Sequence, residues 1–290
     1  MGKILVVGNL TLDIVHSVDH YPAEDEEIRA TAQRYQRGGN AANTAVVLAQ
    51  HGHRVSFAGT LADDDPGRRL AAELEQGGID VRYCQVVPGG VCPLSCITHN
   101  QQSGSRTIVH YRDLPEYTAQ TFATIPLTEY DWFHFEGRNL PQLRQMLEHL
   151  QQVRIDQPIS VEIEKARPDI DHVFAFADVL LFARAYALAC GYETARQLFD
   201  QVQDRSEGAM LVCSWGEAGA FARLRDGAEL QQPAQQVNRI CDSVGAGDTF
   251  NAGVIHGLLS RQTLAAALAY ANDLAAKKLQ QVGFDGLLGG

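Results

Sequence analysis

The amino-acid sequence predicts an α/β fold in which helices flank a mostly parallel sheet. Short apolar runs alternate with segments of helical periodicity, as repeated strand-helix units require. The runs that we interpret as strands are 3–7, 54–59, 131–135, 158–163, 178–182 and 209–214. Because strands joined through a helix usually pair in parallel, these runs are expected to form one sheet with helices on both faces.

Three segments carry the clearest helical pattern. Residues 41–51 end at Gly52, residues 67–76 end at Gly77-Gly78, and residues 263–279 are rich in alanine and leucine. Glycine commonly follows a helix because it readily adopts the left-handed backbone conformation there. The 290 residues, 45% of them apolar, can bury a large core and show no internal repeat. We therefore expect a single domain over residues 1–290.

Two β-prone stretches, about 12–33 and 91–112, interrupt the strand-helix rhythm. In the second stretch, 95–98 and 107–111 flank Gln101-Gln-Ser-Gly104, which predicts a hairpin with Gly104 in its turn. Such strands would interrupt a parallel sheet. The two stretches are expected to form a small β-sheet lid over one end of it, which would exclude water from a site beneath.

Charge and composition exclude several classes of function. With 24 basic and 35 acidic residues, the net charge of −11 disfavours binding to nucleic acid or an anionic membrane. No apolar run approaches the roughly 20 residues that span a bilayer, and the first residues read as a strand, so a cytoplasmic location is expected. The six cysteines include no Cys-x-x-Cys pair, which favours structural cysteines over a metal site.

The segment Asp242-Ser-Val-Gly-Ala-Gly-Asp248 places small residues and a carboxylate at the start of an apolar helix. Backbone amides can converge there on an anion, and the helix N-terminus adds its positive end. The chain has no Walker loop, and Phe250 stands where a dinucleotide fingerprint needs its third glycine. Taken alone, the segment is equally compatible with close packing of a helix on a strand.

A second segment, Arg37-Gly-Gly-Asn-Ala-Ala-Asn43, places paired glycines before a helix. Asn40 alone could be an ordinary N-cap, but the glycines would let the backbone approach a polyhydroxyl ligand. Carboxamides both donate to and accept from hydroxyls. Charged residues also follow several predicted strands, where ligands bind in open α/β sheets, although a solvated surface would carry charges there too. These residues are Asp13, Glu136, Arg138, Glu162, Glu164 and Arg184.

Together and in this order, the two segments resemble the two signatures of the ribokinase-like (PfkB) carbohydrate kinases. The resemblance extends from Ile4 to Asp285 and is greatest to the ketohexokinase branch of that family. Six further segments carry this closer match: Tyr21-Pro-x-Glu-Asp-x-Glu-Ile-Arg29, Arg34-x-Gln-Arg-Gly-Gly-Asn40, Arg106-Thr-Ile-Val109, Glu136-Gly-Arg-Asn139, Leu211-Val-Cys-x-Trp215 and Gly283-Phe-Asp-Gly286.

The resemblance implies a ribokinase-like fold and transfer of the ATP γ-phosphate to a primary hydroxyl of a ketohexose, D-fructose at C1. Asp248 would be the base, and Gly245, Ala246 and Gly247 would form the anion hole. The helix dipole is expected to lower the basicity of Asp248, whereas ATP phosphates act in the opposite direction. The alternatives are another free sugar or the C6 hydroxyl, and, from a different class, a sugar-binding sensor without turnover.

The resemblance also assigns binding residues. For the sugar and the transferred phosphate they are Asp13, Asp25, Gly39, Asn40, Asn43, Arg106, Glu136 and Arg138. For ATP they are Arg184, Trp215, Gly216, Glu217 and Gly219.

Two departures from the family pattern concern the nucleotide and the metal. Arg184 replaces a lysine near the ATP phosphates, and Leu181-Phe-Ala-Arg-Ala-Tyr186 lacks the carboxylate that helps relatives to organise magnesium. We therefore expect Mg²⁺ to be held mainly by phosphates and water, with Glu164 nearby and no direct protein ligand. Activation by a monovalent cation stays open. A homodimer through the β lids is also expected, because open strand edges need covering.

Overall fold

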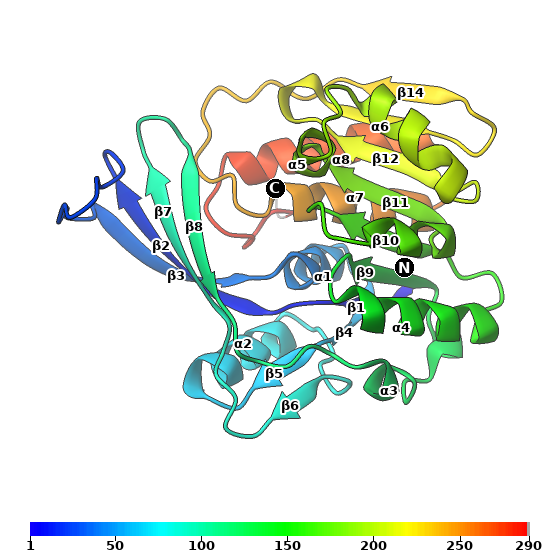
Figure 1. Cartoon of the computed structure of the whole chain (residues 1–290), viewed down its shortest axis with the longest axis horizontal. Helices are drawn as coiled ribbons and strands as arrows, with labels where there is room; N and C mark the ends of the chain where they lie inside the picture. The colour runs from blue at the N-terminus through cyan, green and yellow to red at the C-terminus, as the bar shows by residue number, and fades with distance from the viewer. Residues whose placement is uncertain (289–290) are drawn as a thin grey trace.

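A central eight-stranded sheet organises the protein (Figure 1). The computed structural model describes residues 1–288. The strands lie in the order β14-β13-β12-β11-β10-β9-β1-β4, with β12 to β4 all paired in parallel. The parallel strands are β1 (Lys3–Val7), β4 (Arg54–Ala58), β9 (Trp132–Glu136), β10 (Ile159–Ile163), β11 (Val179–Ala183) and β12 (Met210–Ser214). All the predicted strands are confirmed, with ends that differ slightly.

Helices cover both faces of this sheet. The helices are α1 (Asn40–Gln50), α2 (Asp65–Gln76), α3 (Ala119–Phe122), α4 (Leu140–Val153), α5 (Arg184–Ala189), α6 (Ala195–Val202), α7 (Ala246–Leu259) and α8 (Leu264–Leu279). Short 3-10 helices span Leu127–Glu129, Ile170–Phe176, Gln203–Arg205 and Gly216–Ala218. The three predicted helices are confirmed. α2 starts earlier than predicted, at Asp65, because Asp64 caps it by accepting from the Gly67 amide at 2.9 Å.

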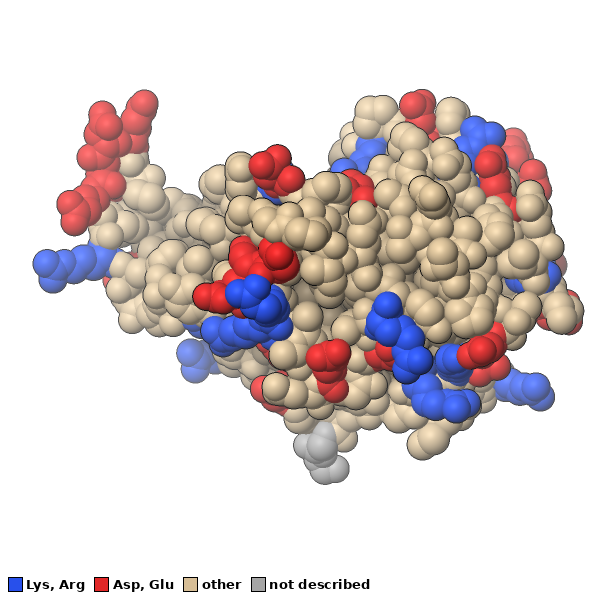
Figure 2. All heavy atoms as spheres, turned by 90° about the horizontal axis from the view of Figure 1, so that it is seen from below, with Lys and Arg blue, Asp and Glu red and all other residues tan. Residues whose placement is uncertain are grey.

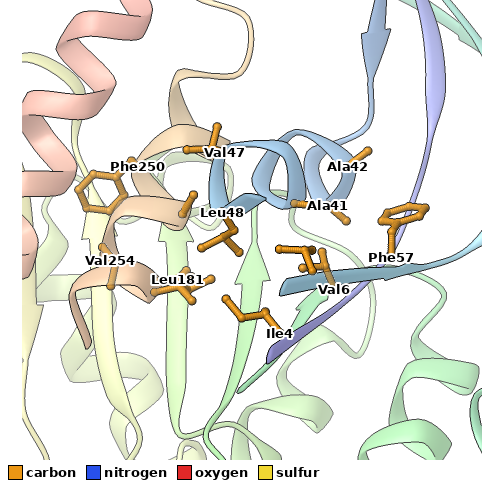
Figure 3. Packing of buried hydrophobic residues seen from close by; sticks show 14 of the residues in the cluster. Ile4, Val6, Ala41, Ala42, Val47, Leu48, Phe57, Leu181, Phe250 and Val254 are labelled. Atoms are coloured by element: carbon orange, nitrogen blue, oxygen red, sulfur yellow. The ribbon is translucent and has the colours of Figure 1, made fainter. Parts of the chain in front are cut away.

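Two apolar clusters, one on each face of the sheet, hold the helices in place. On one face, Ile4 and Val6 of β1 pack against Leu48 of α1, and Phe250 and Val254 of α7 lie beside them (Figure 3). Burial of a large aliphatic or aromatic side chain contributes about 1.5–3 kcal/mol. This packing fixes the N-terminal ends of α1 and α7 near the carboxyl ends of the parallel strands.

A second sheet of four strands projects from the side of the molecule (Figure 1). Its order is β3 (Ala32–Gly38), β2 (Thr11–Val18), β7 (Leu94–Asn100) and β8 (Arg106–Tyr111). The predicted hairpin is confirmed, because β7 and β8 pair antiparallel and Gly104 has a φ of 69°. The central strands of this sheet, β2 and β7, pair in parallel.

The boundaries predicted for this second sheet were partly wrong. β3 continues through Gly38, since Gly38 pairs with Thr11, whereas residues 19–31 form the loop between β2 and β3. Asp13 lies within β2, the strand that follows β1, in agreement with the β-prone stretch predicted from residue 12. Viewed from below, several acidic side chains gather at the outer end of the projection, beside a basic one (Figure 2). The acidic residues of the loop are Asp19, Glu24, Asp25, Glu26 and Glu27.

Sequence patterns missed two short pairs of strands. β13 (Ala220–Arg223) and β14 (Glu229–Gln232) add an antiparallel hairpin to the edge of the central sheet, and β5 (Thr60–Ala62) pairs with β6 (Gln85–Val87). Runs of three or four residues are too short to show a period. Among residues 1–288, no helix has both the length and the apolar character needed to cross a membrane.

Candidate active site

The two sequence motifs meet where α1 and α7 begin. The Asn43 side-chain amide donates a hydrogen bond to Asp248 Oδ2 at 2.7 Å, and the Thr44 hydroxyl donates to the Asp248 carbonyl at 3.3 Å. Both acceptors belong to the first turn of α7, and the side chains of Asn43 and Asp248 are only 3% and 6% exposed. The structure therefore joins segments that lie far apart in the sequence into one buried polar site.

The turn before α7 has the shape of an anion cradle. Gly245 has a φ of 80°, and a Cβ there would lie 2.2 Å from the Phe284 ring, so only glycine fits. No side chain caps α7, and the Ala246 amide makes only a long bond to the Ser243 carbonyl at 3.5 Å, so this helix start can donate to a ligand. A Cβ on Gly247 would meet nothing within 4 Å, so there is open space in front of this turn. An anion placed there would also interact favourably with the helix dipole.

The turn before α1 brings the backbone close to two polar groups. Gly39 has a φ of 99°, and a Cβ there would lie 2.2 Å from the Asn9 carbonyl oxygen. A Cβ on Gly38 would lie 2.3 Å from the Asp13 carboxylate, which also accepts from the Thr11 hydroxyl at 3.2 Å. Gly38 is therefore required for the Asp13 side chain to lie against this turn, and Gly39 for the Asn9 backbone to do so.

Several carboxylates surround Asp248. The Asn40 amide donates to Glu162 Oε1 at 3.1 Å and to Glu164 Oε2 at 3.2 Å. Burial raises the pKa of Asp248 to about 7, although the Asn43 hydrogen bond acts in the opposite direction, and the charges of Glu164 and Glu136 raise it further. The sequence predicted opposing effects of the helix dipole and the ATP phosphates on Asp248, and the structure adds burial, which raises its pKa.

Two other acids share this environment. Burial raises the pKa of Glu162 well above its usual value, and the nearby charges of Asp248, Glu136 and Glu164 act in the same direction. Burial also raises the pKa of Asp13, although hydrogen bonds from Ser95 and Thr11 oppose the shift. The cluster of carboxylates therefore favours the binding of cations, and Asp248 can accept a proton near neutral pH.

The carboxylates suit a hard divalent cation. Glu162 Oε2 is buried without a hydrogen-bond partner, and carboxylate oxygens are the ligands that Mg²⁺ prefers. Within residues 1–288, no three His, Cys, Asp or Glu side chains are arranged to hold a metal alone. A cation beside Glu162 and Glu164 would therefore need further oxygen donors, such as phosphate or water.

Arg106 and Arg138, which the sequence assigned to the sugar and phosphate site, differ in whether their charges are already paired with acidic side chains. Arg106 of β8 donates to the Ser243 hydroxyl at 3.0 Å, which places its charge beside the anion cradle. Arg138 is paired with Glu116 at 2.5 Å and with Glu136 at 3.4 Å. Its charge is therefore already engaged by protein groups. Glu136 also accepts from the Asn9 backbone amide at 3.0 Å.

The residues predicted to bind ATP lie together near the ends of β11 and β12. Arg184 begins α5, and its guanidinium carbon lies 6.0 Å from the centre of the Trp215 ring. Gly216 and Gly219 have positive φ angles of 59° and 90°, and Glu217 between them is exposed. A Cβ on Gly219 would lie 2.1 Å from the Gln232 carbonyl, so this turn requires glycine.

Asp25 is the predicted site residue that the structure does not bring to this cluster. It is exposed in the loop between β2 and β3, with a φ of 62°, at the outer end of the second sheet (Figure 1). All the other predicted sugar-binding residues lie on elements that border the starts of α1 and α7.

The model of the pfkB family carbohydrate kinases matches residues 1–286. The chain belongs to this family. It is 39% identical to a ketohexokinase from Mus musculus over 99% of both chains. Among solved structures, a ribokinase from Giardia lamblia superposes with a TM-score of 0.85 at 16% identity, over 98% of this chain and 95% of the other. An Arabidopsis thaliana ribokinase complexed with ribose and ATP superposes with a TM-score of 0.79 at 19% identity, over 97% of this chain and 94% of the other.

These comparisons confirm the predicted fold and the predicted class of activity. The protein is a sugar kinase of the pfkB family, a family whose members use ATP and usually Mg²⁺. The ribokinase-like α/β fold, with its small second sheet, is shared with the solved ribokinases.

Sequence reasoning missed several residues that border the kinase site. Arg112 donates to Asn9 Oδ1 at 3.1 Å and pairs with Glu116 at 3.4 Å. Glu162 was noted only as a charge near a strand end, and Asn9 was not noted at all. Apart from the Arg112–Glu116 pair, these contacts join residues more than a hundred positions apart, so no local pattern could have identified them.

The raised pKa of Asp248 predicts that the stability of the kinase depends on pH. A carboxyl with a higher pKa in the folded state stabilises the fold fully below its unfolded pKa of about 4. That contribution is lost as the pH rises through about 7. We expect Asp248→Asn to flatten the fall in unfolding free energy between about pH 4 and pH 7, since Asn stays neutral and can still accept from Asn43.

Urea unfolding at several pH values measures this effect, with Asp25→Asn as an exposed control. Glu162 remains in the Asp248→Asn variant, so part of the pH dependence of the unfolding free energy will persist. Equal slopes for wild type and Asp248→Asn would contradict the assignment.

Proposed function

We propose that this kinase transfers the γ-phosphate of ATP to the C1 hydroxyl of D-fructose or a closely related free ketohexose. The observation that carries the proposal is the buried Asp248 carboxylate, held by Asn43 beside the open anion cradle at Gly247. The 39% identity to mouse ketohexokinase supports a ketohexose as the acceptor.

Asp248 is suited to accept the proton of the attacking hydroxyl. Its pKa near 7 lets it act as a base at neutral pH and also take up a proton readily. Transfer of a phosphoryl group has a loose transition state with little bonding to the nucleophile, so positioning and charge stabilisation carry most of the rate. The amides at Gly245, Ala246 and Gly247 would stabilise the charge on the transferred group.

The polar groups around Asp13 and Asn43 would bind the sugar. Asn43 Oδ1 is buried without a partner, so it can accept from a sugar hydroxyl, and Asp13 can engage hydroxyls beside it. A sugar without the matching hydroxyl would leave these groups unpaired, which is costly and gives specificity. Gly39, Asn40, Arg106, Glu136 and Arg138 complete the proposed sugar and phosphate site.

ATP would extend from the anion cradle towards the turn at Trp215. We assign Arg184 to the phosphates, and Trp215, Gly216, Glu217 and Gly219 to the adenosine side. When bound, Mg²⁺ neutralises phosphate charge, and we propose that it is held mainly through phosphates and water, with Glu162 and Glu164 facing it. Activation by a monovalent cation is a separate question that an assay in different salts will decide.

The first prediction from this proposal concerns the product. With ATP, Mg²⁺ and D-fructose, we expect release of ADP and formation of fructose 1-phosphate. Phosphorus-coupled NMR of the product identifies the carbon that carries the phosphate, and a panel of free sugars identifies the preferred acceptor. Phosphate only on C6 would overturn the C1 assignment. No ADP release with any sugar would favour a binding protein without turnover.

The second prediction concerns the base. Asp248→Asn keeps the size of the side chain and the acceptor for Asn43, but it cannot take up a proton. We expect kcat to fall by about 10²- to 10⁴-fold, while ADP affinity stays within a few-fold of the wild type. Steady-state kinetics and calorimetry measure the two effects. A variant with normal kcat would exclude Asp248 as the base.

We also propose that the kinase is a homodimer formed through the second sheets, which then act as lids. The outer strands β3 and β8 have one unpaired edge each among the described residues. The sheet also exposes large apolar side chains, which favours an interface. They are Tyr35, Ile108, Val109 and Tyr111. The remote position of Asp25 then fits a role at the site of the other subunit.

Mixed dimers test this arrangement. Asp248→Asn and Asp25→Asn are each expected to have reduced activity, because one lacks the base and the other a sugar ligand. If Asp25 acts across the dimer, mixing and reassociating the two variants restores one complete site in each mixed dimer. A rate of ADP release by the mixture that exceeds the sum of the rates of the two separate variants would show that Asp25 acts across the dimer. Sedimentation velocity with only monomer at micromolar concentration would exclude the dimer.

A further inference from the structure

Lys278 is a fully buried lysine that the proposed reaction does not use. Its side chain is 0% exposed in the last turn of α8, although lysine is almost never buried unless it is paired. Its ammonium group contacts Asp242 Oδ2 at 3.2 Å, the Asp242 carbonyl at 3.4 Å and the Gln281 carbonyl at 3.4 Å. Three oxygens therefore surround one buried positive charge.

The same end of α8 is docked onto the segment that leads to the anion cradle. The carbonyl of Leu279 accepts from the Cys241 amide at 2.7 Å and from the Asp242 amide at 3.3 Å. These contacts cap the C-terminus of α8, where the helix dipole is negative and a cation is favoured. Lys278 therefore lies where α8 and this segment meet.

Asp242 connects Lys278 to the shape of the cradle. Its carboxylate accepts from the Val244 amide at 3.1 Å, which fixes the turn directly before Gly245. The Arg34 guanidinium of β3 pairs with the same carboxylate at 3.2 Å. Phe284, which closes the space beside Gly245, has its ring centre 5.2 Å from the Lys278 nitrogen.

We propose that Lys278 is a positioning residue whose ammonium acts as a fixed internal cation of the anion cradle. It holds the Asp242 carboxylate and carbonyl so that the turn through Gly245 presents the first amides of α7 to the transferred phosphoryl group. The inference rests on the proposed kinase function of this site. Lys278 itself does not touch the phosphoryl group, and no part of its role requires it to exchange a proton.

The test compares Lys278→Met with Lys277→Met. Both residues lie in the last turn of α8, but Lys277 is exposed and provides a matched control. We expect Lys278→Met to lower kcat by about 10- to 100-fold, with little change in the KM for the sugar, because the cradle is misplaced rather than removed. Lys277→Met should behave as the wild type. A folded Lys278→Met protein with unchanged kcat would overturn the proposal.

Chemical rescue separates a missing charge from general damage. Lys278→Ala leaves space beside Asp242, so ammonium or methylammonium ions should restore a measurable part of kcat. Lys278→Met fills that space and should respond no more than the wild type. If these ions raised kcat equally in Lys278→Ala, Lys278→Met and the wild type, or did not raise it in Lys278→Ala, the result would count against a fixed cation.

If Lys278→Met does not fold, Lys278→Gln replaces it, since a carboxamide donates to the same oxygens without charge. Full kcat in Lys278→Gln would overturn the proposal.

A second readout does not depend on which sugar is the substrate. Amide hydrogen exchange should be faster over residues 242–247 in Lys278→Met than in Lys277→Met, with the rest of the chain unchanged. Unaltered exchange there would overturn the positioning role. Failure of the wild type to release ADP with any sugar would instead overturn the proposed function and leave the exchange result to decide the role of Lys278.

Discussion

The close approach of the N-terminal ends of α1 and α7 is the constraint on which the site depends. The hydrogen bond from Asn43 to Asp248 requires both helices to begin at the same edge of the central sheet, and the apolar packing of Leu48, Phe250 and Val254 holds them there. Glycines at both helix starts remove the Cβ atoms that would prevent this approach. The positive ends of two helix dipoles and a buried carboxylate then share one small volume.

Four acids gather at this point, and the protein must balance their charges. Burial raises the proton affinity of Asp248 and Glu162, and the nearby charges of Glu136 and Glu164 add to the effect. Cations reduce that cost: Arg138 pairs with Glu136, Arg106 lies near Asp248, and Lys278 neutralises Asp242 behind the cradle.

The sequence predicted the features that depend on local pattern. The parallel strands, the helices at 41–51 and 263–279 and the hairpin around Gly104 follow from periodicity and turn chemistry, and the paired motifs identified the family. It could not predict contacts such as Asn9 with Arg112, or the burial of Lys278, because they depend on residues distant in the chain. The effect of burial on the pKa of Asp248 could not be predicted for the same reason, because the sequence indicates the helix dipole but not the burial of the side chain.

Two arginines tie the second sheet to the cradle from opposite edges of that sheet. Arg34 of β3 binds Asp242, and Arg106 of β8 binds Ser243, both in the turn that precedes Gly245. Any movement of the projecting sheet must therefore either break these bonds or pull the turn before Gly245 with it. Movement of the second sheet and loosening of this turn are therefore mechanically coupled.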